Sequence, residues 1–307
     1  MNSHTTAVVL LTTQYIPEQS EFYSQLSKYG YDFYTIVDAE EKIANPAKHH
    51  GVVQIADEVC KAVGLLRMNP TLNKPSPVCT WEKSIYFFSH VKPGYKQIWF
   101  IEYDVFVPNI DLIKDLDERF PEAEFLARKY KKMRNNLLEP WPNAHLAPTH
   151  LIPKPWARGM VCISRFSGDL INSVSEFMEK NNVNDEIYGL IEFIIHTIAL
   201  RDKRRMETPR EFNNVTFKHA RKLFLYHQES DWQAQEISAD SFYHPVKNYE
   251  DQIRLRLNYG NFTPAEKIFW KMGKNLLFIG GFFAKAPGFY VGLSKRYLKE
   301  VRTRLNY

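Results

Sequence analysis

Cysteine and long apolar runs are scarce in this chain. Cys60, Cys79 and Cys162 are scattered over 307 residues without a CxxC pair. Few, isolated cysteines are typical of a reducing compartment, and their spacing excludes a cysteine-based zinc site. No apolar run approaches the roughly 20 residues that span a bilayer, and the stretch 7–11 is too short for a secretory signal. The sequence therefore predicts a cytoplasmic protein.

Several common catalytic and nucleotide-binding motifs are also missing. The chain has no GxxxxGK[ST], GxGxxG, HExxH or GxSxG pattern and no internal repeat. A net charge of +5 is small for this length and indicates no particular partner. An apolar fraction of 44% suffices for a core, which predicts one large domain with an appendage or two small domains.

The N-terminal part alternates between strand and helix patterns. An apolar run at 7–12 predicts a buried strand, and the apolar spacing over 17–29 predicts a helix that Gly30 ends. A second strand is expected over 33–37, closed by Asp38. This β-α-β order predicts a parallel sheet whose ligands bind at the carboxyl ends of its strands.

The remaining elements follow from the same periodicities. Proline-rich, asparagine-rich or polar stretches predict loops over 69–79, 135–155 and 243–247. We expect strands over 98–107, 124–127, 160–164 and 224–227, and helices over 81–90 (capped by Thr80), 111–120, 169–179 and 186–200.

Two acidic residues interrupt the most apolar of these strands. Glu102 and Asp104 lie in the run 98–107, whose carboxyl end Pro108 marks. A buried carboxylate is costly unless it is paired, so these acids either sit at an exposed strand end or bind a cation. Oxygen ligands suit Mg²⁺ or Mn²⁺, and such an ion would carry phosphates.

The motif Glu102-Tyr103-Asp104 resembles the DxD signature of GT-A glycosyltransferases, with Glu in the first place. The resemblance extends over the order of elements from residue 7 to about residue 250. It implies a GT-A (Rossmann-like) α/β fold with a mixed, mostly parallel sheet flanked by helices. It also implies a divalent metal, Mn²⁺ or Mg²⁺, that bridges the motif to a nucleotide-diphosphate sugar. A chance pair of acids on a surface strand remains the alternative.

The resemblance further implies a donor site at the first strand ends. Thr12, Thr13 and Asp38 would hold the nucleoside, and Lys83 at the start of its helix would reach a phosphate. Asp38 could equally be a turn or cap residue, and Lys83 a solvated lysine.

A second metal ligand is implied in the segment His244-Pro245-Val246-Lys247, because many GT-A enzymes bring a late histidine to the metal. The implied ligands are Asp104 and His244, with Glu102 acting directly, through water or on the ribose. Lys247 is placed to contact phosphate. With ten histidines present, an ordinary loop histidine remains the alternative.

Acceptor and catalytic positions are implied between these motifs. Trp156, Arg158 and Gly159 would form the floor of the acceptor site. An inverting enzyme would need a general base, and the sequence does not distinguish inversion from retention. The candidate catalytic acids are Asp185, Glu186 and Glu192. Alternatively, Glu186 is a favourable acid near a helix start and Glu192 a solvated helix residue.

The C-terminal segment differs in character from the rest. Residues 261–307 interleave aromatic side chains with lysine and arginine, which is typical of an interfacial membrane segment but also of a lid with a basic face. We therefore divide the chain into a catalytic domain, 1–260, and this extension.

Together these patterns predict a metal-dependent glycosyltransferase at the cytoplasmic membrane face, with a glycan or glycolipid acceptor and no nucleic acid. The alternative is a non-catalytic protein that binds membranes or nucleic acid through basic segments such as 128–132 and 201–205.

Overall fold

The structure, a computed structural model, describes residues 5–13, 15–38, 51–65, 78–133, 154–181, 191–215, 224–225, 238–244 and 246–247. The chain divides into one unit of residues 1–217 and 236–246 and another of 218–235 and 247–307. The predicted boundary at residues 260 and 261, and the basic segment after it, lie outside the described residues. None of the described helices is both long and apolar enough to cross a bilayer.

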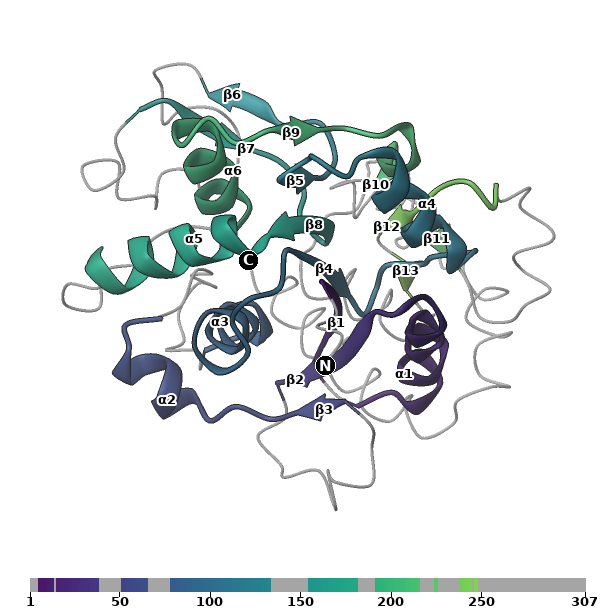
Figure 1. Cartoon of the computed structure of the whole chain (residues 1–307), viewed down its shortest axis with the longest axis horizontal. Helices are drawn as coiled ribbons and strands as arrows, with labels where there is room; N and C mark the ends of the chain where they lie inside the picture. The colour runs from purple at the N-terminus through teal and green to yellow at the C-terminus, as the bar shows by residue number, and fades with distance from the viewer. Residues whose placement is uncertain are drawn as a thin grey trace, which may run out of the picture. The chain divides into compact units, whose positions relative to one another are not determined.

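A seven-stranded sheet forms the centre of the first unit (Figure 1). Within it, β8 runs antiparallel to its neighbours and the other strands run in one direction. This confirms the predicted α/β class with a mixed, mostly parallel sheet. From edge to edge the strands are β3 (Val52–Val53), β2 (Asp32–Val37), β1 (Thr6–Thr12), β4 (Gln97–Glu102), β8 (Ile163–Ser167), β5 (Phe125–Leu126) and β9 (Met206–Glu207).

The first β-α-β unit forms as its sequence predicts. Helix α1 (Pro17–Ser24) begins at a proline, which suits the first helical turn because a proline lacks the N–H that has no partner there. It continues as the 3₁₀ helix η1 (Gln25–Tyr29), and Gly30 ends it with a φ of +80°. A left-handed φ strains residues that have a Cβ, so glycine suits this stop.

The remaining helices and short strands complete the described fold. In the described part of the chain, three pairs of short strands lie outside the main sheet: β6 with β7, β10 with β12, and β11 with β13. The helices are α2 (Asp57–Ala62), α3 (Thr80–Tyr86), the π-helical η3 (Phe87–Val91), α4 (Asp111–Arg119), α5 (Gly168–Asn181), α6 (Ile191–Arg201) and the 3₁₀ helix η5 (Arg210–Phe212). The short strands are β6 (Lys131–Met133), β7 (Trp156–Arg158), β10 (Asn214–Val215), β11 (Phe224–Leu225), β12 (Tyr243–His244) and β13 (Val246–Lys247).

Two apolar clusters cover the two faces of the sheet. Along β4, Ile98 and Phe100 belong to one cluster, whereas Trp99 and Ile101 belong to the other. This alternation follows from the two-residue period of a strand. Helices α3, α5 and α6 cover the first face, and α1 and α4 cover the second (Figure 1).

Several predicted boundaries were wrong. Strand β4 ends at Glu102, because the chain turns there and places Val105 and Val107 in the core as irregular backbone. Strand β8 covers 163–167 instead of 160–164, and 243–247 holds short strands where a loop was expected. The residue that caps α3 is Cys79, not Thr80.

Candidate functional site

The carboxyl ends of β1, β2 and β4 meet at one edge of the sheet. The N–H of Asp38 donates to the carbonyl of Thr12 at 2.9 Å, and the N–H of Tyr103 donates to the carbonyl of Leu11 at 2.9 Å. The chain adds β2 on one side of β1 and β4 on the other, so the strand order reverses here. Ligands of open α/β sheets bind at such a point.

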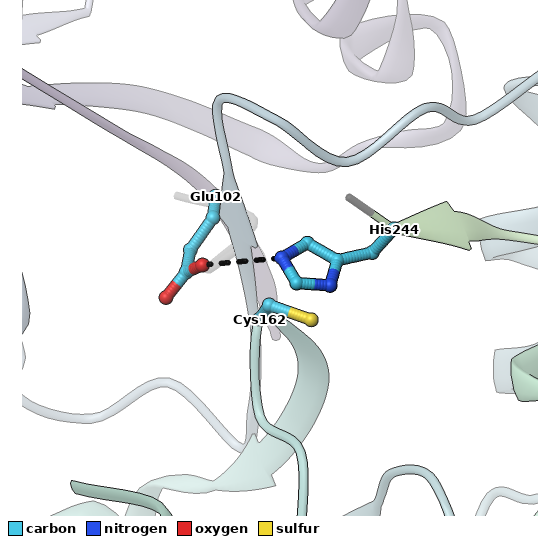
Figure 2. A group of neighbouring side chains, drawn as sticks. All are labelled: Glu102, Cys162 and His244. Atoms are coloured by element: carbon cyan, nitrogen blue, oxygen red, sulfur yellow. Dashed lines mark ion pairs between the residues drawn. The ribbon is translucent and has the colours of Figure 1, made fainter. Parts of the chain in front are cut away.

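Metal-binding side chains converge at this edge. Glu102, Cys162 and His244 each offer one ligand atom, and these atoms all lie within 4.8 Å of one another. Figure 2 shows the imidazole of His244 next to the Glu102 carboxylate and the Cys162 thiol. His244 Nε2 is 3.9 Å from Glu102 Oε2 and 3.5 Å from Asp104 Oδ1. Asp104 and His244 are buried, with 7% and 4% of their surface exposed.

The fold fixes each of these side chains through neighbouring elements. Phe106 and Tyr243 exchange backbone hydrogen bonds of 2.9 and 3.0 Å, which bring the adjacent His244 to the end of β4. The indole N–H of Trp81 donates to Glu102 Oε1 at 2.8 Å and thereby orients the other oxygen of that carboxylate. The Trp81 ring itself stacks on Phe100, with ring centroids 5.2 Å apart.

The electrostatics of the cluster favour a positive charge. Burial by itself would lower the pKa of His244, but its interactions with Cys162 and Asp104 raise that pKa well above its usual range. Burial also raises the pKa of the Cys162 thiol, to about 11. Two carboxylates beside one imidazole thus surround a position where a cation is stabilised.

The donor set fits a divalent cation. Carboxylate oxygens suit Mg²⁺ and Mn²⁺, and an imidazole adds a ligand that Mn²⁺ and Zn²⁺ accept more readily than Mg²⁺ does. Glu102, Asp104 and His244 were all predicted ligands, and the structure brings them together. Their roles as ligands remain a prediction.

The predicted donor residues lie along the same edge. Lys83 Nζ is 2.7 Å from Asp38 Oδ1 and 2.9 Å from Asp57 Oδ1, and only 6% of its side chain is exposed. Burial lowers the pKa of Lys83, but hydrogen bonds to the two carboxylates more than offset this and leave the pKa raised. Lys83 is therefore held by two acids, which reduces its reach toward a phosphate. Thr12 is buried, whereas Thr13 is exposed.

Glu192 lies in the first turn of α6 and has an unusual environment. Its Oε2 atom is enclosed without a hydrogen-bond partner among the described residues. Burial, together with the charge of Glu102, raises its pKa to about 7, while a hydrogen bond from its own backbone N–H and the charge of His244 oppose the shift. A carboxyl group with a pKa near neutrality can exchange a proton with a substrate.

The predicted acceptor floor packs against the same helix. The N–H of Ala157 in β7 donates to Thr197 Oγ1 at 3.1 Å, next to the buried Trp156 and the half-buried Arg158. A Cβ on Gly159 would lie 2.5 Å from His196 Nε2, so this position holds no larger residue without displacement.

Other predicted positions are less well defined by the structure. Asp185 and Glu186 lie outside the described residues. Lys247 lies in β13, where the structure describes only the backbone.

Sequence reasoning missed three members of the site. Cys162 was set aside because it lacks a CxxC partner, but a single cysteine can join carboxylates and imidazole in space. Trp81 and Asp57 were also overlooked. Trp81 and Asp57 contact side chains that are distant in the sequence, and no local sequence pattern predicts such contacts.

The fold and the site together define an α/β protein with a candidate divalent-cation site at the carboxyl edge of its sheet. No protein-family model matches the chain, and no curated protein matches its sequence.

Three solved structures with partial similarity are glycosyltransferases. One is involved in glycosylation of the major capsid of PBCV-1; it is 10% identical, with 81% of this chain and 98% of that chain covered and a TM-score of 0.35. Mouse xyloside xylosyltransferase 1 is 13% identical over 78% and 96% of the two chains, with a TM-score of 0.36. An active-site mutant of LgtC is 7% identical over 79% and 86%, with a TM-score of 0.38. Values this low assign neither a family nor an activity to the chain.

Proposed function

We propose that this protein is a metal-dependent glycosyltransferase that moves a sugar from a nucleotide-diphosphate donor to a hydroxyl of a glycan or glycolipid. The observation that carries the proposal is the convergence of Glu102, Asp104 and His244 at the carboxyl edge of β4. Glu102 and Asp104 form the DxD-like motif, and His244 is the late histidine. The Nε2 atom of His244 lies 3.5 Å from the Asp104 carboxylate and 3.9 Å from the Glu102 carboxylate.

Each group has a defined task in this proposal. Glu102, Asp104 and His244 hold Mn²⁺ or Mg²⁺, which when bound neutralises the diphosphate and stabilises the leaving nucleotide. Thr12 and Asp38 bind the nucleoside at the neighbouring strand ends. Other residues serve the acceptor: Trp156, Arg158 and Gly159 form its floor, and Glu192 accepts the proton of its hydroxyl if the enzyme inverts the configuration.

The alternative of a non-catalytic protein that binds phosphates through basic segments is less well supported. In the segment 201–205, three arginines already have acidic neighbours. Arg204 is 2.7 Å from Glu124, and the pairs of Arg201 with Asp202 and Arg205 with Glu207 are 3.3 and 3.7 Å long. Paired arginines attract a phosphate less strongly than unpaired ones.

A binding experiment tests the enzyme proposal. Mn²⁺ with a nucleoside diphosphate should raise the melting temperature of the full chain, by an amount set by ligand concentration over Kd. Asp104→Asn keeps the shape and removes the charge, so it should abolish that shift and donor hydrolysis. Asp115→Asn, on the exposed side of α4, is the matched control. Nucleotide binding and hydrolysis that survive in Asp104→Asn would refute the proposal.

The histidine is tested separately. His244→Ala should weaken the Mn²⁺ requirement more than any other single histidine substitution. The control is His90→Ala. The imidazole of His90 lies 2.9 Å from the carboxylate of Glu179, outside the candidate metal site. An unchanged metal requirement in His244→Ala would remove this residue from the site.

The place of action is a further part of the proposal. We assign it to the cytoplasmic face of a membrane, because the basic aromatic segment 261–307 suits an anionic surface. Truncation from residue 263 should release the chain from anionic vesicles and leave donor hydrolysis measurable. Continued vesicle binding would refute the anchor.

A further inference from the structure

We propose that Cys162 is a thiolate ligand of the candidate metal site, so that the site prefers thiophilic divalent cations such as Zn²⁺ and Cd²⁺ over Mg²⁺. This inference rests on the metal site of the proposed function, but not on sugar transfer. The Cys162 thiolate is a soft ligand. The other ligands of the site are two carboxylates, which are hard, and one imidazole, which is borderline.

The position of Cys162 is set by the backbone. Strands β4 and β8 pair antiparallel, with Ile101 opposite Ile163. One step further along this register, the N–H of Glu102 donates to the carbonyl of Cys162 at 2.8 Å. The thiol and the carboxylate are thus carried by directly opposed residues on neighbouring strands.

The spacing of the donors suits one shared ion. Two ligands of a tetrahedral ion, at about 2.0 Å for nitrogen or oxygen and about 2.3 Å for sulfur, lie roughly 3.3 to 3.5 Å apart. His244 Nε2 lies 3.5 Å from Asp104 and 3.9 Å from Glu102, and the ligand atoms of Glu102, Cys162 and His244 all lie within 4.8 Å. Closing the site therefore requires these atoms to approach one another by at most about 1.5 Å.

Binding through sulfur has a defined proton balance. The thiol of Cys162 loses its proton to solvent as the metal–sulfur bond forms. The imidazolium of His244 releases a second proton to solvent, so that its ring nitrogen can bind the ion. No oxidant or reductant takes part. A thiolate adds a strong bond to Zn²⁺ or Cd²⁺ and little to Mg²⁺, which favours oxygen ligands.

Cadmium provides a direct probe of the sulfur. We expect the reduced, full-length protein to show a thiolate-to-Cd²⁺ charge-transfer absorption in the ultraviolet when Cd²⁺ is added. Cys162→Ser should lose this absorption, and its affinity for Cd²⁺ should fall at least about tenfold. Even the loss of a residue that only contacts a metal ligand lowers metal affinity by about this factor. Mn²⁺ affinity, measured by calorimetry, should change less than about threefold.

Controls separate ligation from folding. Cys60→Ser alters another buried cysteine, in α2, and should keep the absorption. Cys162→Ala, which has an apolar side chain, should also lose the absorption and the Cd²⁺ affinity. Urea unfolding checks that each variant folds. An absorption that persists in Cys162→Ser, or that never forms in the wild type, would overturn the inference.

The outcomes also distinguish the two proposals. Thiolate binding of Cd²⁺ without donor hydrolysis would refute the enzyme and keep the Cys162 ligand. Mn²⁺-dependent hydrolysis with equal Cd²⁺ affinity in wild type and Cys162→Ser would keep the enzyme and refute the ligand.

Discussion

Substituting Gln for Glu192 is expected to change how the free energy of unfolding depends on pH. The pKa of this carboxyl is raised to about 7 in the folded protein, mainly by burial, against 4.5 for an unperturbed glutamate. Between these two values the folded state binds more protons than the unfolded state, so the stability of the wild type falls as pH rises. The full shift corresponds to about 3 kcal/mol.

Glutamine has a similar shape and does not titrate, so Glu192→Gln should lack this loss. From about pH 5 to about pH 8, the wild type should lose roughly 2 to 3 kcal/mol relative to the variant. Urea unfolding at several pH values, with a chelator to exclude metal binding, measures the difference. Glu176→Gln, on the exposed side of α5, is the control. Parallel stability curves for the wild type and Glu192→Gln would refute the reasoning.

Two other substitutions test the packing beneath the site. Gly159→Ala places a Cβ 2.5 Å from Nε2 of the buried His196 and should lower the free energy of unfolding by about 1 to 3 kcal/mol. Adding His196→Ala to this variant should restore part of the lost stability. If the losses from the two substitutions simply add, the two side chains do not clash. Lys83→Met leaves Asp38 and Asp57 without their shared cation and should lower the free energy of unfolding by about 2 to 3 kcal/mol at neutral pH. The loss of stability should be smaller in acid, where the carboxylates are protonated. An equal loss in acid would exclude the carboxylates as its cause.

Local patterns predicted the first half of the sheet well. The run at 7–12 is apolar because β1 is buried on both faces, and Gly30 ends its helix because a left-handed φ is required there. The position of the candidate site at the carboxyl edge also followed from the β-α-β order. These features depend on residues close together in the sequence.

Boundaries and partners that depend on distant residues were not predictable. The run 98–107 is uniformly apolar, and nothing in it shows that β4 stops at Glu102 while Val105 and Val107 enter the core without strand structure. The partner of Glu102 was likewise hidden. Cys162 meets it only because β8 runs antiparallel, and a sequence does not reveal the register of two strands so far apart.

The reversed direction of β8 has a consequence for when the site can form. Glu102 and Cys162 become neighbours only after β4 and β8 have paired in the correct register, and His244 arrives from still further along the chain. Closing such long loops is slow compared with forming a helix or a hairpin. The candidate cation-binding cluster therefore belongs to the late steps of folding, and a metal ion that binds it would bind only chains in which β4 and β8 are already paired.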